Sequence, residues 1–305
     1  MINLSGVSKY FDKVPAVDEI SFQANEREIL VLLGPSGCGK TTTLKMINRL
    51  IEPDKGSIVI NGQDIKDQKP EDLRKGIGFV MQHSGLFPHY TVEENIAVVP
   101  TLLKWDKKKI RNRTMELMEK LHLAEQLLTR LPQELSGGQQ QRVGIARALI
   151  ANTPILLMDE PFGALDNITK ADIHSEFKSL EELKNKTIII VTHDIQEAFE
   201  LGHRICLMDK GKIVQIGTPK EMLYKPVNDF VSDFFASNRL LLEHKIALMK
   251  DVFSFITDDK FGDNIISADT SVWDVMQRYS GQNKDLERYE AISKAFNAYR
   301  KIQLS

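Results

Sequence analysis

EILVLLGPSGCGKTT, residues 28 to 42, is the stretch that decides the fold of this chain. Its first part, Glu28–Leu33, is predicted to be a buried strand, because Ile29–Leu33 is an apolar run of strand length that ends at Gly34. After the glycines, Thr41–Leu50 has the composition of a helix. A buried strand that leads into a helix is typical of a parallel α/β sheet, so we expect an α/β fold built around this stretch.

The glycine-rich turn matches the pattern G-x-x-x-x-G-K-[ST], which binds phosphate groups. Glycines let backbone N–H groups converge on phosphate oxygens, and the N-terminus of the following helix adds positive charge. Lys40 would bind the β- and γ-phosphates, and the hydroxyl of Thr41 would bind Mg²⁺. Cys38 lies in this turn, and a thiol at a helix N-terminus can have a lowered pKa, so its alkylation should block nucleotide binding. A tolerated variable position is the alternative. The candidate nucleotide-binding residues here are Gly34, Pro35, Ser36, Gly37, Cys38, Gly39, Lys40, Thr41 and Thr42.

On both sides of this stretch, short apolar runs alternate with helical patterns. Strands are expected at Ile58–Ile60, Ile77–Met81, Ile155–Met158, Thr187–Val191, Ile205–Met208 and Ile213–Ile216. The segment from about residue 88 to residue 151 lacks strand signals and contains two helical stretches, Lys107–Leu121 and Gly138–Ile150. We interpret this segment as a helical subdomain inserted into the α/β domain.

Two carboxylates, Asp159 and Glu160, follow the apolar run Ile155–Met158. Ligands of α/β sheets bind at the carboxyl ends of the strands, so both acids should lie near the phosphate-binding turn. Asp159 would hold Mg²⁺, and Glu160 would activate a water molecule as a general base. A strand that merely runs into an acidic, solvated turn is the alternative.

A second motif, Leu135-Ser136-Gly137-Gly138-Gln139-Gln140-Gln141-Arg142, resembles the signature motif of ABC ATPases. Ser136 and the glycine pair begin a predicted helix, so a hydroxyl, free N–H groups and the helix dipole would face an anion. The resemblance implies that Ser136, Gly137, Gly138 and Gln139 act on ATP that a second subunit holds. It also implies a P-loop NTPase domain with an antiparallel β subdomain. A serine N-cap followed by a flexible glycine pair is the structural alternative.

Further elements of the ABC family follow in order along the chain. Gln82 resembles the glutamine that reaches Mg²⁺ and the attacking water, and His193 resembles the histidine near the γ-phosphate. Asp166, in Ala164-Leu165-Asp166, resembles the residue that crosses the dimer interface. Phe11 falls where the family stacks an aromatic ring on adenine, and Tyr10 remains an alternative. The resemblance therefore implies Glu160, His193 and Gln82 as catalytic residues, and Thr41, Gln82 and Asp159 as Mg²⁺ ligands.

Within the ABC family, the sequence most resembles the ATPase subunits of osmoprotectant importers. Those importers carry glycine betaine, choline, carnitine or proline. Three segments carry this resemblance: Lys45–Pro53, Gly85–His89 and Val99–Trp105. It implies ATP and Mg²⁺ as cofactors. It implies as partners a second copy of the chain, integral membrane permease subunits and, indirectly, a substrate-binding protein. An importer for an amino acid, sugar or metal and a non-transport ABC ATPase remain alternatives.

Composition limits where the chain can act. The 305 residues carry a formal net charge of −2, so the charge balance does not indicate nucleic acid as a partner. Two cysteines, Cys38 and Cys206, are too few for a disulfide framework. Met1–Tyr10 has no apolar h-region, so no signal peptide is expected, and no apolar run approaches the roughly 20 residues of a membrane span. We therefore expect a peripheral protein on the cytoplasmic face of the cell membrane.

The sequence pattern changes near residue 240, which predicts a domain boundary there. Residues 1–240 carry the ABC ATP-binding domain, and residues 241–305 form a small, mainly helical extension. Leu242, Ile246, Met249, Phe253 and Ile256 follow helical spacing there. A pair of CBS modules often follows the ATPase in the osmoprotectant family, but 65 residues are too few for a pair. The extension is expected to have a regulatory or dimerising role.

Overall fold

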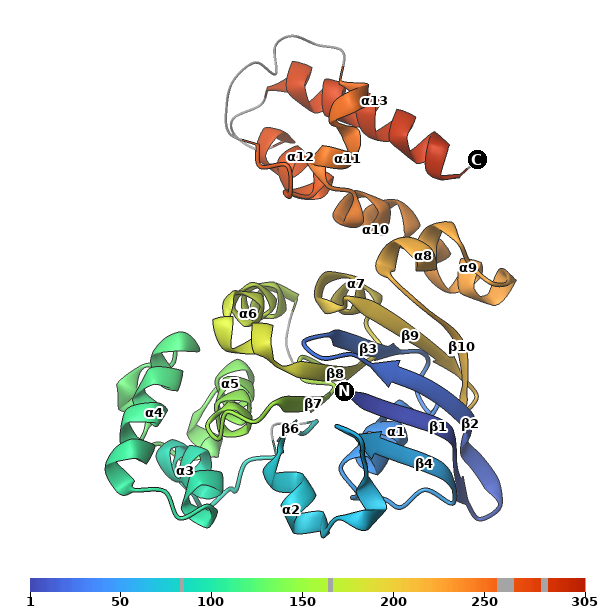
Figure 1. The fold of residues 1–305 in the computed structure, drawn as a ribbon. Coiled ribbons are helices and arrows are strands. Elements are labelled where there is room, and N and C mark those ends of the chain that lie inside the picture. Colours follow the sequence, from blue (N-terminus) through green and yellow to red (C-terminus); the bar gives the residue numbers. More distant parts are fainter. Residues whose placement is uncertain (83–84, 164–166, 257–265, 281–284, 305) are drawn as a thin grey trace. The chain divides into compact units, whose positions relative to one another are not determined.

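The computed structural model describes residues 1–82, 85–163, 167–256, 266–280 and 285–304 (Figure 1). The chain forms two compact units, Met1–Val214 and Gln215–Ser305. Two sheets lie in the first unit, and the second is mainly helical. The boundary predicted near residue 240 marks where the family resemblance ends rather than where contacts are sparse, and it stays a prediction.

A six-stranded sheet with the order β10-β9-β3-β8-β7-β6 organises the first unit. Its strands are β3 (Ile29–Leu33), β6 (Ile77–Val80), β7 (Ile155–Asp159), β8 (Thr187–Thr192), β9 (Arg204–Asp209) and β10 (Lys212–Gly217). β3 is parallel to β8 and β9, and β7 is parallel to β8 and β6. The carboxyl ends of these strands therefore share one edge, where the chain continues to Gly34, Gln82, Glu160 and His193.

Helices cover both faces of this sheet. Figure 1 shows α6 (Asn167–Ser179) and α7 (Ile195–Leu201) on one face and α1 (Lys40–Ile47) on the other. α1 contacts β7 and β8 of this sheet and β2 (Val14–Ala24) of the next one. It is shorter than the predicted helix Thr41–Leu50, because Arg49 adopts a left-handed conformation with φ 52°. Few residues other than glycine adopt that conformation inside a helix.

The second sheet is antiparallel, as the family resemblance implied, and has the order β2-β1-β4-β5. Besides β2, its strands are β1 (Ile2–Phe11), β4 (Lys55–Ile60) and β5 (Gln63–Asp64). Asn61 and Gly62 join β4 to β5 with φ angles of 51° and 83°. The Asn-Gly pair suits this hairpin because both residues tolerate positive φ.

A helical lobe lies between β6 and β7 in the sequence, as predicted. Its helices are α3 (Val92–Leu102), α4 (Lys107–Lys120) and α5 (Gly137–Leu149), and α2 (Pro70–Lys75) precedes β6. Figure 1 shows α3, α4 and α5 beside the β6 end of the sheet. α3 lies outside the two helical stretches predicted here, although Thr91 and Glu94 form a capping box at its start. The 3₁₀ segments of the chain are Ile65–Asp67, Glu125–Leu127, Pro132–Glu134, Glu181–Asn185 and Phe253–Phe255.

Short helices build the second unit. They are α8 (Pro219–Tyr224), α9 (Asp229–Ala236), α10 (Arg239–Ile246), α11 (Met249–Val252), α12 (Val272–Ser280) and α13 (Leu286–Gln303). Apolar side chains of α11, α12 and α13 form a common core that includes Met249, Val252, Val275, Ile292 and Phe296. The spacing from Leu242 to Ile256 predicts one continuous helix, but the helix is interrupted between α10 and α11. Leu248 is extended there and forms an isolated β-bridge with Ser271.

Within this unit, polar contacts link helices on both sides of residue 240. The carboxylate of Glu243 is fully buried and accepts hydrogen bonds from Arg239 and from Arg300 of α13. Lys220 of α8 lies 2.9 Å from Asp251 of α11. A buried carboxylate is costly unless it is paired, so these arginines support the packing of α10 against α13.

None of the helices in the described part of the chain combines the length and apolar character required to cross a bilayer.

Candidate functional site

The phosphate-binding turn keeps a shape that only glycine tolerates at two positions. Gly34 and Gly39 have φ angles of 152° and 102°. A Cβ at Gly34 would lie 2.1 Å from the carbonyl oxygen of Met208, and one at Gly39 would lie 2.4 Å from that of Ala16. Both distances are far below van der Waals contact, so the turn is held tightly between β9 and β2.

Lys40 begins α1, and its side chain folds back over the turn. The ammonium Nζ donates to the carbonyl oxygens of Gly34, at 2.7 Å, and Pro35, at 2.9 Å. Only 5% of the residue is exposed. The turn therefore holds a positive charge beside the N-terminus of α1, where the helix dipole also favours anions.

Cys38 lies within the same turn but is buried, with 3% exposure. Its Sγ is 3.7 Å from the Lys40 ammonium. Burial raises the pKa of the Cys38 thiol above its ordinary value, although the nearby Lys40 charge opposes this shift. A thiol that stays protonated and covered reacts slowly with alkylating reagents, so this side chain is poorly placed for the modification considered above.

Thr41 and Asp159 meet at the carboxyl edge of the sheet. The hydroxyl of Thr41 donates to Oδ1 of Asp159 over 2.7 Å. Burial raises the pKa of Asp159, and the hydrogen bond from Thr41 opposes that shift. A hydroxyl and a carboxylate side by side are hard oxygen donors of the kind that Mg²⁺ prefers.

Glu160 lies between two polar side chains from neighbouring loops. Gln82 donates its Nε2 to Oε2 of Glu160 over 3.1 Å, and Nδ1 of His193 lies 3.2 Å from Oε1. The backbone of Glu160 has a φ of 44°, which turns the chain sharply at the end of β7. The backbone N–H of Glu160 donates to the carbonyl of Val191 in β8 over 2.9 Å. The structure thus brings together the three residues that the sequence predicted as catalytic.

A pocket of about 300 Å³ joins these groups. Its lining residues are Ala16, Ser36, Gly37, Gly39, Lys40, Thr41, Thr42, Gln82 and Glu160. Ala16 is not among the predicted site residues, because an alanine in a strand carries no chemical signal. The pocket therefore places the phosphate-binding turn and the Glu160 carboxylate around one volume.

The signature segment caps α5 and does not line this pocket. Ser136 accepts a hydrogen bond from the backbone N–H of Gln139 at 3.3 Å, and Gln139 accepts one from the N–H of Ser136 at 2.9 Å. Ser136 and Gly137 are exposed, so the start of α5 is open to another molecule. Ser136 therefore forms the N-cap that the sequence offered as the structural alternative, and Gln139 extends it to a capping box. The action on a second subunit stays a prediction.

Two other predicted residues lie away from the pocket lining or cannot be placed. Phe11 ends β1 with 48% of its surface exposed, whereas Tyr10 is half-buried and its N–H donates to Asp54. Both assignments to adenine stay predictions. Asp166 lies outside the described residues.

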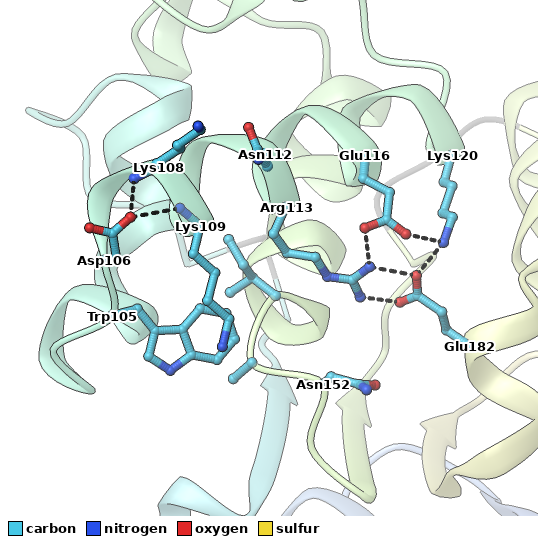
Figure 2. Close-up of a pocket in the computed structure, with 12 residues that line it drawn as sticks. Trp105, Asp106, Lys108, Lys109, Asn112, Arg113, Glu116, Lys120, Asn152 and Glu182 are labelled. Carbon is cyan, nitrogen blue, oxygen red and sulfur yellow. Dashed lines mark hydrogen bonds and ion pairs between the residues drawn. The ribbon is translucent and has the colours of Figure 1, made fainter.

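A larger pocket of about 970 Å³ lies between α4 and the segment Glu181–Asn185, and Figure 2 shows its lining. Four of its charged side chains pair with one another. Arg113 lies 2.6 Å from Glu182 and 2.7 Å from Glu116, and Lys120 lies 2.6 Å from both glutamates. Lys109 lies 3.9 Å above the Trp105 ring. Because these four side chains form ion pairs with one another, we interpret this pocket as part of the packing interface between the helical lobe and the α/β core.

Comparison with known proteins was consistent with the geometry. The family model described as "ABC transporter" matches residues 17–163. The glycine betaine uptake system ATP-binding protein YehX of Escherichia coli is 49% identical over 240 residues, which cover 79% of this chain and 78% of YehX. The chain belongs to the ABC transporter family. The predictions of the family and of the ABC ATP-binding fold are confirmed.

Other ABC proteins are similar to this chain as well. The glycine betaine/carnitine/choline transport ATP-binding protein OpuCA of Bacillus subtilis is 51% identical over 79% of this chain, which spans only 64% of OpuCA. A solved dimeric ATP-binding cassette in a post-hydrolysis state, bound to ADP and Pi, has 35% sequence identity and a TM-score of 0.65. That match covers 72% of this chain and 98% of the cassette. An ABC cassette fold that binds nucleotide is therefore shared across these proteins.

Proposed function

We propose that this chain is the ATP-hydrolysing subunit of an ABC importer that takes up a quaternary-amine osmoprotectant such as glycine betaine, choline or carnitine. The placement of Glu160 between Gln82 and His193, beside the phosphate-binding turn, is the observation that carries the ATPase proposal. The substrate class rests on relatives such as YehX and OpuCA, whose names record glycine betaine, carnitine and choline.

ATP would bind with its phosphates in the pocket lined by Ser36, Gly37, Gly39, Lys40 and Thr42. The backbone of the turn, the Lys40 ammonium and the N-terminus of α1 supply donors and positive charge there. The neighbouring Thr41 and Asp159 offer oxygen donors that fit Mg²⁺. Gln82, which is hydrogen-bonded to Glu160, would be the third ligand. When bound, Mg²⁺ would neutralise phosphate charge. Phe11, exposed at the end of β1, would stack on adenine.

In hydrolysis, Glu160 would accept a proton from the attacking water. The water oxygen bonds to the γ-phosphorus as the bond to the β–γ bridging oxygen breaks, leaving ADP and phosphate. Gln82 and His193 contact opposite oxygens of the Glu160 carboxylate, so they would orient this base and the water. The left-handed turn at Glu160 directs the side chain toward the pocket rather than along the strand.

A second copy of the chain would complete each site with the exposed start of α5 at Ser136, Gly137, Gly138 and Gln139, and with Asp166 at the dimer interface. The dimeric state of a similar cassette supports this arrangement. The remaining partners would be integral membrane permease subunits and, indirectly, a substrate-binding protein. The chain would then act peripherally at the cytoplasmic face of the membrane.

The decisive experiment uses the full chain in complex with the membrane subunits that co-purify with it. Glu160→Gln should retain ATP binding and ATP-induced dimerisation but lose at least about 100-fold in hydrolysis, the range expected for a general base. Glu181→Gln, with its side chain 88% exposed, is the matched control and should hydrolyse ATP normally. Near-normal turnover by Glu160→Gln would refute the catalytic assignment.

The substrate class is tested in proteoliposomes that contain the same complex and its binding protein. Glycine betaine, choline or carnitine should stimulate ATP hydrolysis. Stimulation only by an amino acid, sugar or metal ion would replace the osmoprotectant with that solute class.

A further inference from the structure

A lysine outside the predicted catalytic set ties α6 to the loop that carries His193. The ammonium of Lys170 lies 2.5 Å from Oδ2 of Asp194 and 3.4 Å from Oε2 of Glu197. Asp194 directly follows His193, and Glu197 lies in the first turn of α7. The Lys170 side chain is 14% exposed, so water screens this contact only weakly.

Both residues that flank His193 belong to the same bonded network. The hydroxyl of Thr192 donates to Oε2 of Glu197 over 3.1 Å and accepts the N–H of Asp194 at 3.0 Å. Asp194 also caps α7 by accepting the N–H groups of Gln196 and Glu197 with Oδ1. Its second oxygen, Oδ2, accepts from Lys170. One carboxylate thus joins the helix cap to the lysine of α6.

His193 depends on this network because its own side chain is weakly held. The ring is 55% exposed, and its contact with Glu160 is a single distance of 3.2 Å. An exposed ring with one polar contact is positioned mainly by its backbone. The backbone on both sides of His193 is in turn held by Thr192 and Asp194.

Lys170 also compensates a buried negative charge. The side chain of Glu197 is 2% exposed, and its Oε1 has no hydrogen-bond partner in the described part of the chain. Burial raises the pKa of Glu197 to about 7, and the Lys170 charge acts against that shift. Without the Lys170 cation, the carboxylates of Asp194 and Glu197 would repel each other in a partly buried environment.

We propose that Lys170 is a positioning residue for ATP hydrolysis: it ties α6 to the carboxylates beside His193 and thereby holds His193 against Glu160. This inference rests on the proposed function, because it presumes that Glu160 and His193 act on bound ATP. Lys170 touches neither residue, and its role is carried through Asp194 and Glu197.

The test compares Lys170→Met with Lys170→Arg in the full chain and its membrane subunits. Lys178→Met, an exposed lysine on the same helix, is the matched control. Lys170→Met should lower kcat at least about tenfold while the KM for ATP changes less than about twofold, because a misplaced catalytic group costs turnover rather than binding. Lys170→Arg should restore most of the turnover, and Lys178→Met should match the parent chain.

A second variant separates positioning from stability. In Lys170→Met/Glu197→Gln the buried carboxylate charge is removed together with its cation, so folding should recover while kcat stays low. Recovery of kcat in the double variant, or a parent-like kcat in Lys170→Met, would overturn the inference. Equal losses of kcat and ATP binding that arginine does not rescue would also overturn it. If Glu160→Gln still hydrolyses ATP, the proposed function fails instead.

Discussion

The hydroxyl of Thr41 donates a 2.7 Å hydrogen bond to the carboxylate of Asp159, although 118 positions separate the two residues. The bond joins the first turn of α1 to the end of β7. It brings two hard oxygen donors together beside the phosphate-binding turn.

Replacing Thr41 by valine tests whether this pair holds Mg²⁺. The variant loses a hydroxyl donor, and the pKa of Asp159, already raised by burial, should rise further. Affinity for ATP in the presence of Mg²⁺ should fall at least about tenfold, the scale of a lost hydrogen bond to a charged group. Isothermal titration with ATP, with and without Mg²⁺, measures this. Thr41→Ser keeps the hydroxyl and should bind normally. Equal losses with and without Mg²⁺ would argue against a metal role.

Glu197 should make stability depend on pH. Its pKa is raised to about 7 in the folded chain, above the ordinary carboxyl value, so the folded state binds the proton more tightly. Folded stability should therefore fall as pH rises toward 7, by about 1.4 kcal/mol per pH unit at most. Glu197→Gln removes this dependence. The gain in thermal midpoint of the variant over the parent should grow between pH 5 and 7 and then level off. A gain that shrinks over this range would contradict the assignment.

Glu182 should stabilise the packing interface between the helical lobe and the α/β core. It pairs with Arg113 and Lys120 of α4, and its side chain is 14% exposed. Burial opposes its ionisation, but hydrogen bonds from these two residues outweigh burial and lower its pKa. Glu182→Gln leaves Arg113 underpaired and should lower the unfolding free energy by about 1 to 3 kcal/mol. Denaturant unfolding measures the change, and the exposed Glu181→Gln is its control. Equal stabilities of the two variants would exclude this role.

Cys38 should be dispensable for nucleotide binding. It is absent from the pocket lining, and burial raises the pKa of its thiol. Cys38→Ala should bind ATP within about threefold of the parent, since a buried thiol that contacts no ligand contributes little to affinity. In the folded chain, N-ethylmaleimide should label Cys38 much more slowly than it labels the urea-unfolded chain. Rapid labelling that ATP prevents would instead support the reactive thiol considered from the sequence.

Local patterns predicted much of the fold because their causes lie within a few residues. The apolar run Ile29–Leu33 predicted a strand, and the glycines after it predicted the turn into a helix. The serine at residue 136 predicted the start of α5, where it forms an N-cap. The break at Leu248 could not be predicted in this way, because it depends on pairing with the distant Ser271.

The sequence by itself determined the family and the nucleotide motifs, and it predicted site roles for Lys40, Glu160 and His193, since these depend on residue type and spacing along the chain. Only the tertiary structure decided which oxygens meet: Gln82 on one side of Glu160 and His193 on the other. It also decided that Lys170 supports the loop of His193. Such contacts depend on the order of parallel strands, which brings distant loops to one edge of the sheet. No local pattern encodes that order, because it arises from long-range packing of the whole sheet.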